Sequence, residues 1–68
     1  MVTKFQNRLK ELRTEKGLSQ KELAQKIGAT YSAVSFWETG VNEPKISYVI
    51  SLCKFFDVSA DYLLGLVD

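Results

Sequence analysis

The sequence predicts a compact all-α domain of five helices, and three observations favour this class. Apolar residues recur at helical spacing along most of the 68-residue chain. Capping residues and glycines divide the chain into short segments, as helix starts and stops require. A hydrophobic content of 46% is typical of an ordered globule rather than a disordered tail. We therefore expect residues 1–68 to form a single domain.

The first predicted helix covers residues 4–16. Thr3 and Gln6 have the spacing of a capping box at its start, and Gly17 follows its last turn. Its buried stripe has the spacing i, i+4, i+7 and consists of Phe5, Leu9 and Leu12. Arg8 lies beside this stripe, and we interpret it as a solvated basic residue.

The middle of the chain predicts two short helices joined by a three-residue turn. Ser19 and Glu22 have capping-box spacing, so the first helix should begin directly after Ser19. Gly28 offers a left-handed residue that ends it. Thr30 can cap the second helix, which Gly40 ends. Because the turn is so short, the two helices should pack at a steep angle.

The second helix of this pair has two different faces. At about 100° per residue, Val34 and Trp37 fall on one side, which we expect to be buried. Ser32 and Phe36 fall on the opposite side. Residues 31–36 contain no charge, although a solvated helix face usually carries Lys and Glu. The uncharged side therefore indicates a contact surface.

The chain after Pro44 predicts two further helices. The fourth should begin near Lys45, where a good capping side chain is missing. Its predicted core stripe, with Leu52 beside it, is Ile46, Val49, Cys53 and Phe56. Ser59 can cap a last short helix, in which Leu63 and Leu64 should close the core.

Residues spread over nearly the whole chain match the pattern of one family. They are Ser19-Gln20, Glu22-Leu23-Ala24, Ile27-Gly28, Val34-Ser35, Trp37-Glu38, Gly40, Pro44, Val58-Ser59 and Asp61-Tyr62-Leu63-Leu64-Gly65. On these residues the chain resembles the phage repressor and Cro type of helix-turn-helix, the lambda-repressor-like family. The resemblance implies a single Cro/C1-type domain over residues 1–68, with the helix-turn-helix at about 20–39. Its first helix would cross the DNA backbone, and the helix at 31–39 would enter the major groove.

The resemblance also implies which residues contact DNA. Base edges would be contacted by Tyr31, Ser32, Ser35 and Phe36. Phosphates would be contacted by Gln20, Lys21, Thr30, Thr39, Asn42 and Arg13. In this family the residue matching Arg13 often pairs with the one matching Glu38, which would lock the first helix to the recognition helix.

Two features depart from the family pattern. Where relatives often have Lys, Arg or Gln, this chain has Tyr31 and Phe36, which cannot make bidentate contacts to guanine or adenine. A Phe can still pack against a thymine methyl group, and Ser and Tyr hydroxyls can bond to several bases. The loop after Gly40, commonly basic in relatives, contains Glu43, which would repel a phosphate. We therefore expect weak DNA affinity per protomer.

The chain has more apolar residues than so small a core can bury, and those left over gather toward its C-terminal end. A contiguous apolar patch usually marks a partner surface. The family resemblance implies a homodimer there, which would place two recognition helices about 34 Å apart. The predicted interface residues are Ile50, Phe55, Tyr62 and Leu66.

The leading functional hypothesis is a sequence-specific regulator of transcription that binds double-stranded DNA, a bacterial or phage repressor on a palindromic operator. The alternative is a protein-interaction module, such as an antitoxin or antirepressor, which the uncharged helix face and Glu43 favour. A net charge of +1 neither excludes DNA nor supports it, because counterion release depends on local charge.

Composition argues against other classes. With no histidine, no nucleophile paired with a base and no phosphate-binding glycine loop, we expect no enzyme activity. One cysteine and no histidine argue against a metal site or disulfide framework, and we expect no cofactor or small-molecule ligand. No apolar run is long enough to cross a bilayer and the N-terminus is polar and basic, so we expect a cytoplasmic protein without a membrane partner.

Overall fold

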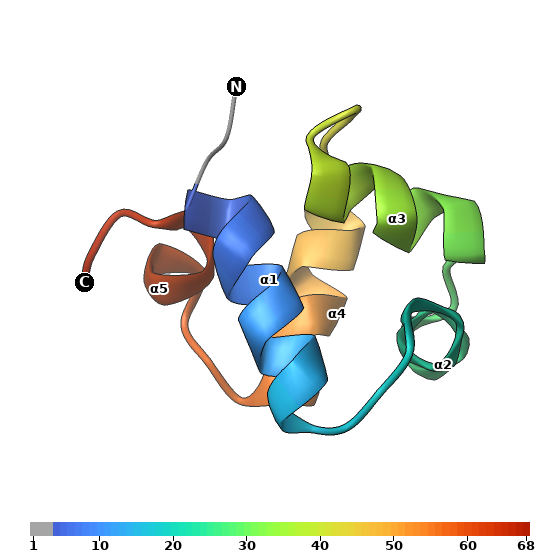
Figure 1. Ribbon diagram of the computed structural model, residues 1–68. Helices are drawn as coiled ribbons and strands as arrows, with labels where there is room; N and C mark the ends of the chain where they lie inside the picture. The colour runs from blue at the N-terminus through green and yellow to red at the C-terminus, as the bar shows by residue number, and fades with distance from the viewer. Residues whose placement is uncertain (1–3) are drawn as a thin grey trace.

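The computed structural model describes residues 4–68, and within that range every regular element is an α-helix (Figure 1). The helices are α1 (Lys4–Glu15), α2 (Gln20–Ile27), α3 (Tyr31–Thr39), α4 (Ile46–Phe56) and α5 (Ala60–Leu64). The predicted all-α, five-helix architecture is therefore confirmed. The predicted capping box at Thr3 and Gln6 includes a residue outside the described range.

The predicted helix pair forms one side of the molecule. In Figure 1, α2 and α3 lie opposite α5 and the C-terminus, with α1 and α4 between the two sides. α1 packs on both α3 and α5, while α2 packs on α3 and α4. The central helices α1 and α4 thus pack against the helix pair, α1 against α3 and α4 against α2.

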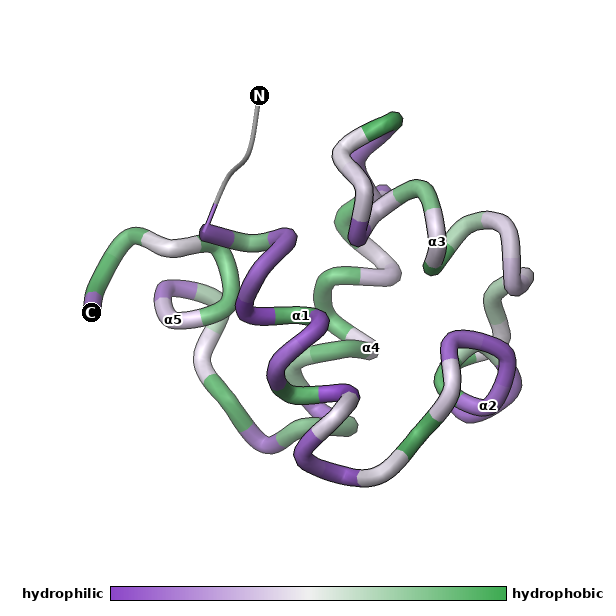
Figure 2. The backbone as a smooth tube through the Cα atoms, viewed as in Figure 1, coloured by the Kyte–Doolittle hydropathy of each residue, from purple (hydrophilic) through white to green (hydrophobic). Residues whose placement is uncertain are grey.

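The core is made of apolar side chains from all five helices. Its buried members are Phe5, Leu9, Leu23, Ala24, Val34, Trp37, Leu52, Phe56 and Leu63. Figure 2 shows α4 as mostly hydrophobic and α2 as largely hydrophilic, which agrees with the central position of α4. The predicted burial of Val34 and Trp37 is confirmed, with Trp37 only 3% exposed.

Two predicted core residues are exposed instead. Ile46 is 78% exposed and Leu64 is 44% exposed. The buried stripe of α4 is centred on Leu52, and Ile46 lies about 120° away from it around the helix axis. In α5, Leu64 is turned by about 100° from the buried Leu63, and a helix of this length buries one face only.

Side-chain caps begin three of the helices where the sequence predicted them. The Ser19 hydroxyl accepts the Glu22 N–H at 3.0 Å, and the Glu22 carboxylate accepts the Ser19 N–H at 2.9 Å. The Thr30 and Ser59 hydroxyls likewise accept a backbone N–H at the starts of α3 and α5, without a carboxylate that reaches back, whereas Lys45 makes no side-chain cap at α4. The bond from the Ser19 backbone lowers the pKa of the Glu22 carboxyl, helped by the Ser19 hydroxyl. This capping interaction is thus complete at neutral pH and is lost as the pH falls through the lowered pKa.

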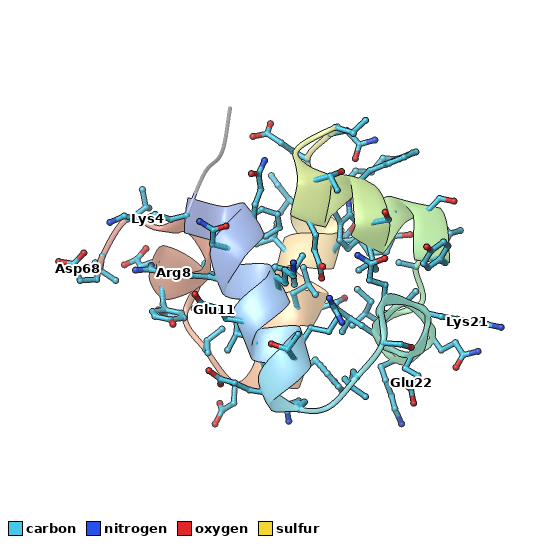
Figure 3. The ribbon with its side chains drawn as sticks, in the orientation of Figure 1. Lys4, Arg8, Glu11, Lys21, Glu22 and Asp68 are labelled. Carbon is cyan, nitrogen blue, oxygen red and sulfur yellow. The ribbon has the colours of Figure 1, made fainter. Side chains whose placement is uncertain are left out.

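Arg8 is not the solvated residue that the sequence suggested. Its Nη1 donates to the carbonyl of Tyr62 and, at 2.6 Å, to that of Val67. Its guanidinium carbon lies 4.3 Å from the centre of the Tyr62 ring, a cation–π arrangement. Lys4 also pairs with Asp68 at 3.3 Å (Figure 3). α1 therefore holds the C-terminal turn of the chain through two basic side chains.

Asp57 ends α4 in the left-handed conformation, with φ 56° and ψ 49°. Side chains are disfavoured there, so we expect Asp57→Gly to raise the free energy of unfolding by about 0.5 kcal/mol. Asp57→Ala should lower it, because alanine lacks the local polar contacts that let aspartate adopt this conformation. Urea denaturation of the three proteins measures both changes. A glycine variant less stable than the alanine variant would contradict the assignment.

Candidate nucleic-acid interface

The turn between α2 and α3 sets the angle of the helix pair. Gly28 adopts φ 74°, a left-handed conformation, and its N–H donates to the carbonyl of Ala24. The N–H of Ala29 donates to the same carbonyl at 2.9 Å, and its side chain packs against the core. Thr30 then caps α3 by accepting the N–H of Ala33 at 3.1 Å. With every residue of the turn held in this way, α3 starts in a fixed direction.

A buried ion pair holds the other end of α3. Arg13 Nε donates to Glu38 Oε2 at 2.7 Å, and Arg13 Nη2 donates to Glu38 Oε1 at 3.0 Å. The two side chains are 11% and 3% exposed, respectively. The hydrogen bond to Glu38 raises the pKa of the Arg13 guanidinium, although burial opposes the shift. The bidentate geometry fixes the distance and the orientation of α3 relative to α1.

The same carboxylate also binds α2. Gln20 Nε2 donates to Glu38 Oε1 at 3.1 Å, and Arg13 Nη1 donates to the carbonyl of Leu18 at 2.8 Å. All three guanidinium nitrogens of Arg13 therefore donate to protein oxygens. This geometry makes Arg13 a structural strut and does not support the phosphate contact expected of it. The role of Gln20 in the network was not foreseen from the sequence, because the sequence gives no sign that its amide reaches Glu38.

The four residues expected to face base edges lie together on the outward side of α3. Tyr31 is 57% exposed and Phe36 is 42% exposed, while Ser32 is exposed and Ser35 half-buried. They form two neighbouring columns, in which each residue lies one turn from its partner: 31 with 35 and 32 with 36. The structure thus assembles the expected contact face and turns it away from the core.

The residues expected to contact phosphates are dispersed around this face. Lys21 is exposed on α2 and extends away from the domain (Figure 3). Asn42 is exposed in the loop after α3, and Thr39 is exposed on its last turn. The Thr39 hydroxyl donates to the carbonyl of Ser35 at 2.9 Å. The Thr30 hydroxyl accepts the N–H of Ala33 and so caps α3. Lys21 and Asn42 are therefore the side chains most open to a phosphate.

The end of α3 is fixed by a close approach to α1. Gly40 adopts φ 80°, and a Cβ there would collide with the side-chain amide of Gln6. Gln6 itself is 8% exposed. The positive φ favours glycine at this point, and a larger residue would also have to displace the Gln6 side chain. The loop that carries Asn42 and Glu43 therefore leaves α3 along a defined path.

An open apolar groove of about 940 Å³ lies beside that loop, between α4, α5 and the start of α1. Its exposed apolar side chains are Val41, Ile46, Ile50 and Leu64. Of these four, only Ile50 was predicted from the sequence to lie on an exposed apolar surface, although the i, i+4 spacing of Ile46 and Ile50 places them on one side of α4.

The structure does not bring the four predicted dimer residues onto one surface. Of these, only Ile50 lines the groove. Phe55 is turned by about 140° from Ile50 around the axis of α4 and packs against Phe56, with ring centres 5.0 Å apart. Tyr62 is covered by Arg8, and Leu66 lies in the turn after α5.

No group of three or more His, Cys, Asp or Glu residues within residues 4–68 could hold a metal ion. Burial raises the pKa of the Cys53 thiol, which is half-buried beside the core. Over the same range, no helix combines the length and the apolar character needed to span a bilayer.

Two short helices, a tight turn and a second helix with an exposed, uncharged outward face define a helix-turn-helix domain. The chain belongs to the helix-turn-helix family, whose model matches residues 9–63. This match confirms the family resemblance of the sequence. Over 61 residues the chain is 38% identical to the HTH-type transcriptional activator BcrR of Enterococcus faecalis, covering 90% of this chain and 30% of that protein.

Solved structures show the same fold. The P22 c2 repressor, in complex with a synthetic operator, has a TM-score of 0.84 and 30% identity, covering 88% of this chain and 91% of that one. SinR, the master regulator for biofilm formation, was solved in complex with DNA and has a TM-score of 0.80 and 36% identity, covering 88% and 97% of the two chains. The chain spans 30%, 54% and 52% of three curated relatives, about half their length or less.

Removing Glu38 should destabilise the fold strongly, because a buried guanidinium would lose its partner. We expect Glu38→Ala to lower the free energy of unfolding by about 3 kcal/mol. The exposed Glu11→Ala on α1 is the matched control and should change it by less than about 0.5 kcal/mol. Replacing both partners with apolar residues, Arg13→Met with Glu38→Leu, should recover much of the loss. Thermal unfolding followed by circular dichroism measures all three, and equal melting of the two alanine variants would contradict the role of the pair.

Proposed function

We propose that this chain is a sequence-specific regulator of transcription that binds double-stranded DNA with α3 in the major groove. The observation that carries the proposal is the outward face of α3, which is uncharged, exposed and held by a rigid scaffold. The names of the relatives support it, since they include a transcriptional activator and a repressor in complex with an operator. We further propose that the protein acts in the cytoplasm, where such DNA is found.

In this proposal α3 reads bases and its surroundings hold the backbone. Tyr31, Ser32, Ser35 and Phe36 face the base edges. This face is flanked by the start of α2, the turn before α3, the last turn of α3 and the loop after it. These segments carry the proposed phosphate contacts Gln20, Lys21, Thr30, Thr39 and Asn42. Backbone N–H groups at helix starts add phosphate donors.

Electrostatic attraction to DNA is weak in one protomer. The helix pair carries two cations, Lys21 and Lys26, and both are exposed. The nearby Arg13 on α1 is neutralised by Glu38. Glu43 is exposed in the loop after α3 and opposes a nearby phosphate. Few phosphates are neutralised per protomer, so useful affinity requires two protomers on one site.

We propose that the protein binds a palindromic operator as a homodimer, with the apolar groove as the contact surface. Ile46, Ile50 and Leu64 are large, exposed and adjacent to one another along this groove. Exposed apolar groups gathered in this way are typical of a partner surface. The groove adjoins the loop after α3, so pairing here sets the two recognition helices side by side. A spacing of about 34 Å would match one turn of DNA.

The protein-interaction alternative is less favoured, because the relatives are named as transcriptional regulators. Selection of bound duplexes from a random library at low salt separates the two functions. A DNA reader should enrich a roughly palindromic site and lose affinity steeply as the salt concentration rises. A library that shows no enrichment, with no retention of DNA in dilute buffer, would refute the proposed function.

Lys21→Ala should weaken binding to all duplexes alike and reduce the salt slope by about 1, since it removes one phosphate contact. Lys4→Ala removes the same charge on the opposite side of the molecule (Figure 3) and is the matched control. Titration of a labelled duplex at several salt concentrations measures both slopes. Equal slopes for the two variants would contradict the docking orientation.

Ile50→Lys should prevent dimer formation, because it places a charge in an apolar contact surface. Binding to the selected palindrome should then weaken at least tenfold, while binding to a half-site stays unchanged. Asn7→Lys adds the same charge on the exposed side of α1, away from the groove, and should leave both properties intact. Sedimentation at high micromolar concentration reports the dimer. An Ile50→Lys protein that still sediments as a dimer would rule out this surface.

A further inference from the structure

The outward face of α3 has an unusual chemical make-up for a reader of bases. Its two large side chains are aromatic, and the two between them are serines. No side chain in residues 31–36 carries an amide, a guanidinium, an ammonium or a carboxylate. The bidentate bonds by which proteins distinguish guanine or adenine are therefore not available to this face.

Phe36 is the side chain least able to make a polar contact. Its ring has neither donor nor acceptor, yet it is 42% exposed on the face that points away from the core. The neighbouring Trp37 is 3% exposed and packs against Tyr48, with ring centres 5.3 Å apart. The core is thus filled by Trp37, and the exposed part of the Phe36 ring is not used for packing within the domain.

The backbone that presents Phe36 is held rigidly. Its carbonyl accepts the N–H of Gly40 and, at 2.9 Å, the N–H of Val41. Two residues further along, Glu38 is fixed by Arg13 and Gln20. One turn earlier, Ser32 is short and leaves room beside the ring. The backbone at Phe36 is therefore held in one place, and its ring is exposed one helical turn from a small residue.

Only one group on the base edges of the major groove is apolar, the methyl group at C5 of thymine. Against any other edge, an apolar ring would desolvate a donor or acceptor without replacing its hydrogen bond. The serine hydroxyls can donate or accept and so tolerate several neighbouring edges. An apolar ring flanked by hydroxyls therefore fits a methyl-bearing pyrimidine.

We propose that Phe36 recognises the C5 methyl group of a pyrimidine in the operator, with the small side chain of Ser32 beside it. This inference rests on the proposed function and names the chemical feature that the site reads. Thymine supplies the methyl group in ordinary DNA, and 5-methylcytosine presents the same group at the same position. Specificity at this position then comes from an apolar contact that salt does not screen.

The test uses the duplex selected from the random library. Each thymine is replaced in turn by deoxyuridine, which removes the methyl group and keeps every hydrogen-bonding group. We expect affinity to fall about fourfold per contacted methyl group at one or two positions of each half-site. At a contacted position, a 5-methylcytosine–guanine pair should also bind more tightly than a cytosine–guanine pair. These two arms distinguish the methyl group from the rest of the thymine ring.

The protein variants assign the contact to one side chain. Phe36→Ala should bind the thymine and deoxyuridine duplexes equally, whereas Asn42→Ala should weaken both and keep their ratio. Phe36→Leu, which retains an apolar side chain, should keep part of the discrimination. Circular dichroism establishes that each variant is folded.

Three outcomes are decisive. Loss of the thymine preference in Phe36→Ala alone supports the inference. A selected operator that binds equally well with deoxyuridine throughout overturns the inference and leaves the proposed function intact. A library without any enriched site overturns the proposed function itself, and the inference with it.

Discussion

The orientation of α3 depends on one carboxylate, that of Glu38. It accepts three hydrogen bonds, two from Arg13 on α1 and one from Gln20 on α2. The core of so small a domain is limited, and apolar contacts are non-directional, so they resist sliding of one helix over another only weakly. A bidentate, buried ion pair has a single good geometry. The ion pair therefore fixes the angle of α3 relative to α1, which the apolar core alone would leave variable.

The ion pair and the contact face are separated around the axis of a single helix. Val34, Trp37 and Glu38 hold α3 against the domain, whereas Tyr31, Ser32 and Phe36 point away from it. Side chains on the outward face make few packing contacts with the core. This separation explains how the chain keeps the helix-turn-helix scaffold while its contact face, residues 31–36, has no charged or amide side chain. Residues that stabilise the fold and residues that contact a partner lie on different sides of α3. The contact residues can therefore be substituted without changing the fold.

Most helix ends and the two sides of α3 were predictable from sequence because they depend on neighbouring residues. The caps at Ser19 and Thr30 and the inward side of α3 are examples. The failures involve distance along the chain. Arg8 binds carbonyls 54 and 59 residues away, which no local pattern reveals. Periodicity predicted a buried stripe on α4 but not its centre, so Ile46 was wrongly placed in the core. The four residues predicted for a dimer interface were those left over from the core, and their spacing could not show that Ile50 and Phe55 lie on different sides of α4. For the candidate site, the pattern supplied the face of α3, while only the structure showed that Arg13 is occupied as a strut.

A recognition face without cations changes the balance between specific and non-specific binding. Non-specific affinity for DNA comes from neutralised phosphates and falls steeply with salt, whereas contacts to base edges add a term that depends on sequence. Because Arg13 is paired and the net charge is only +1, the protein should have little non-specific affinity for DNA. Because a genome offers a vast excess of competing sites, discrimination depends on the ratio of the two affinities rather than on either alone. Weak general attraction, combined with apolar contacts and a paired second protomer, raises that ratio at the expense of absolute strength.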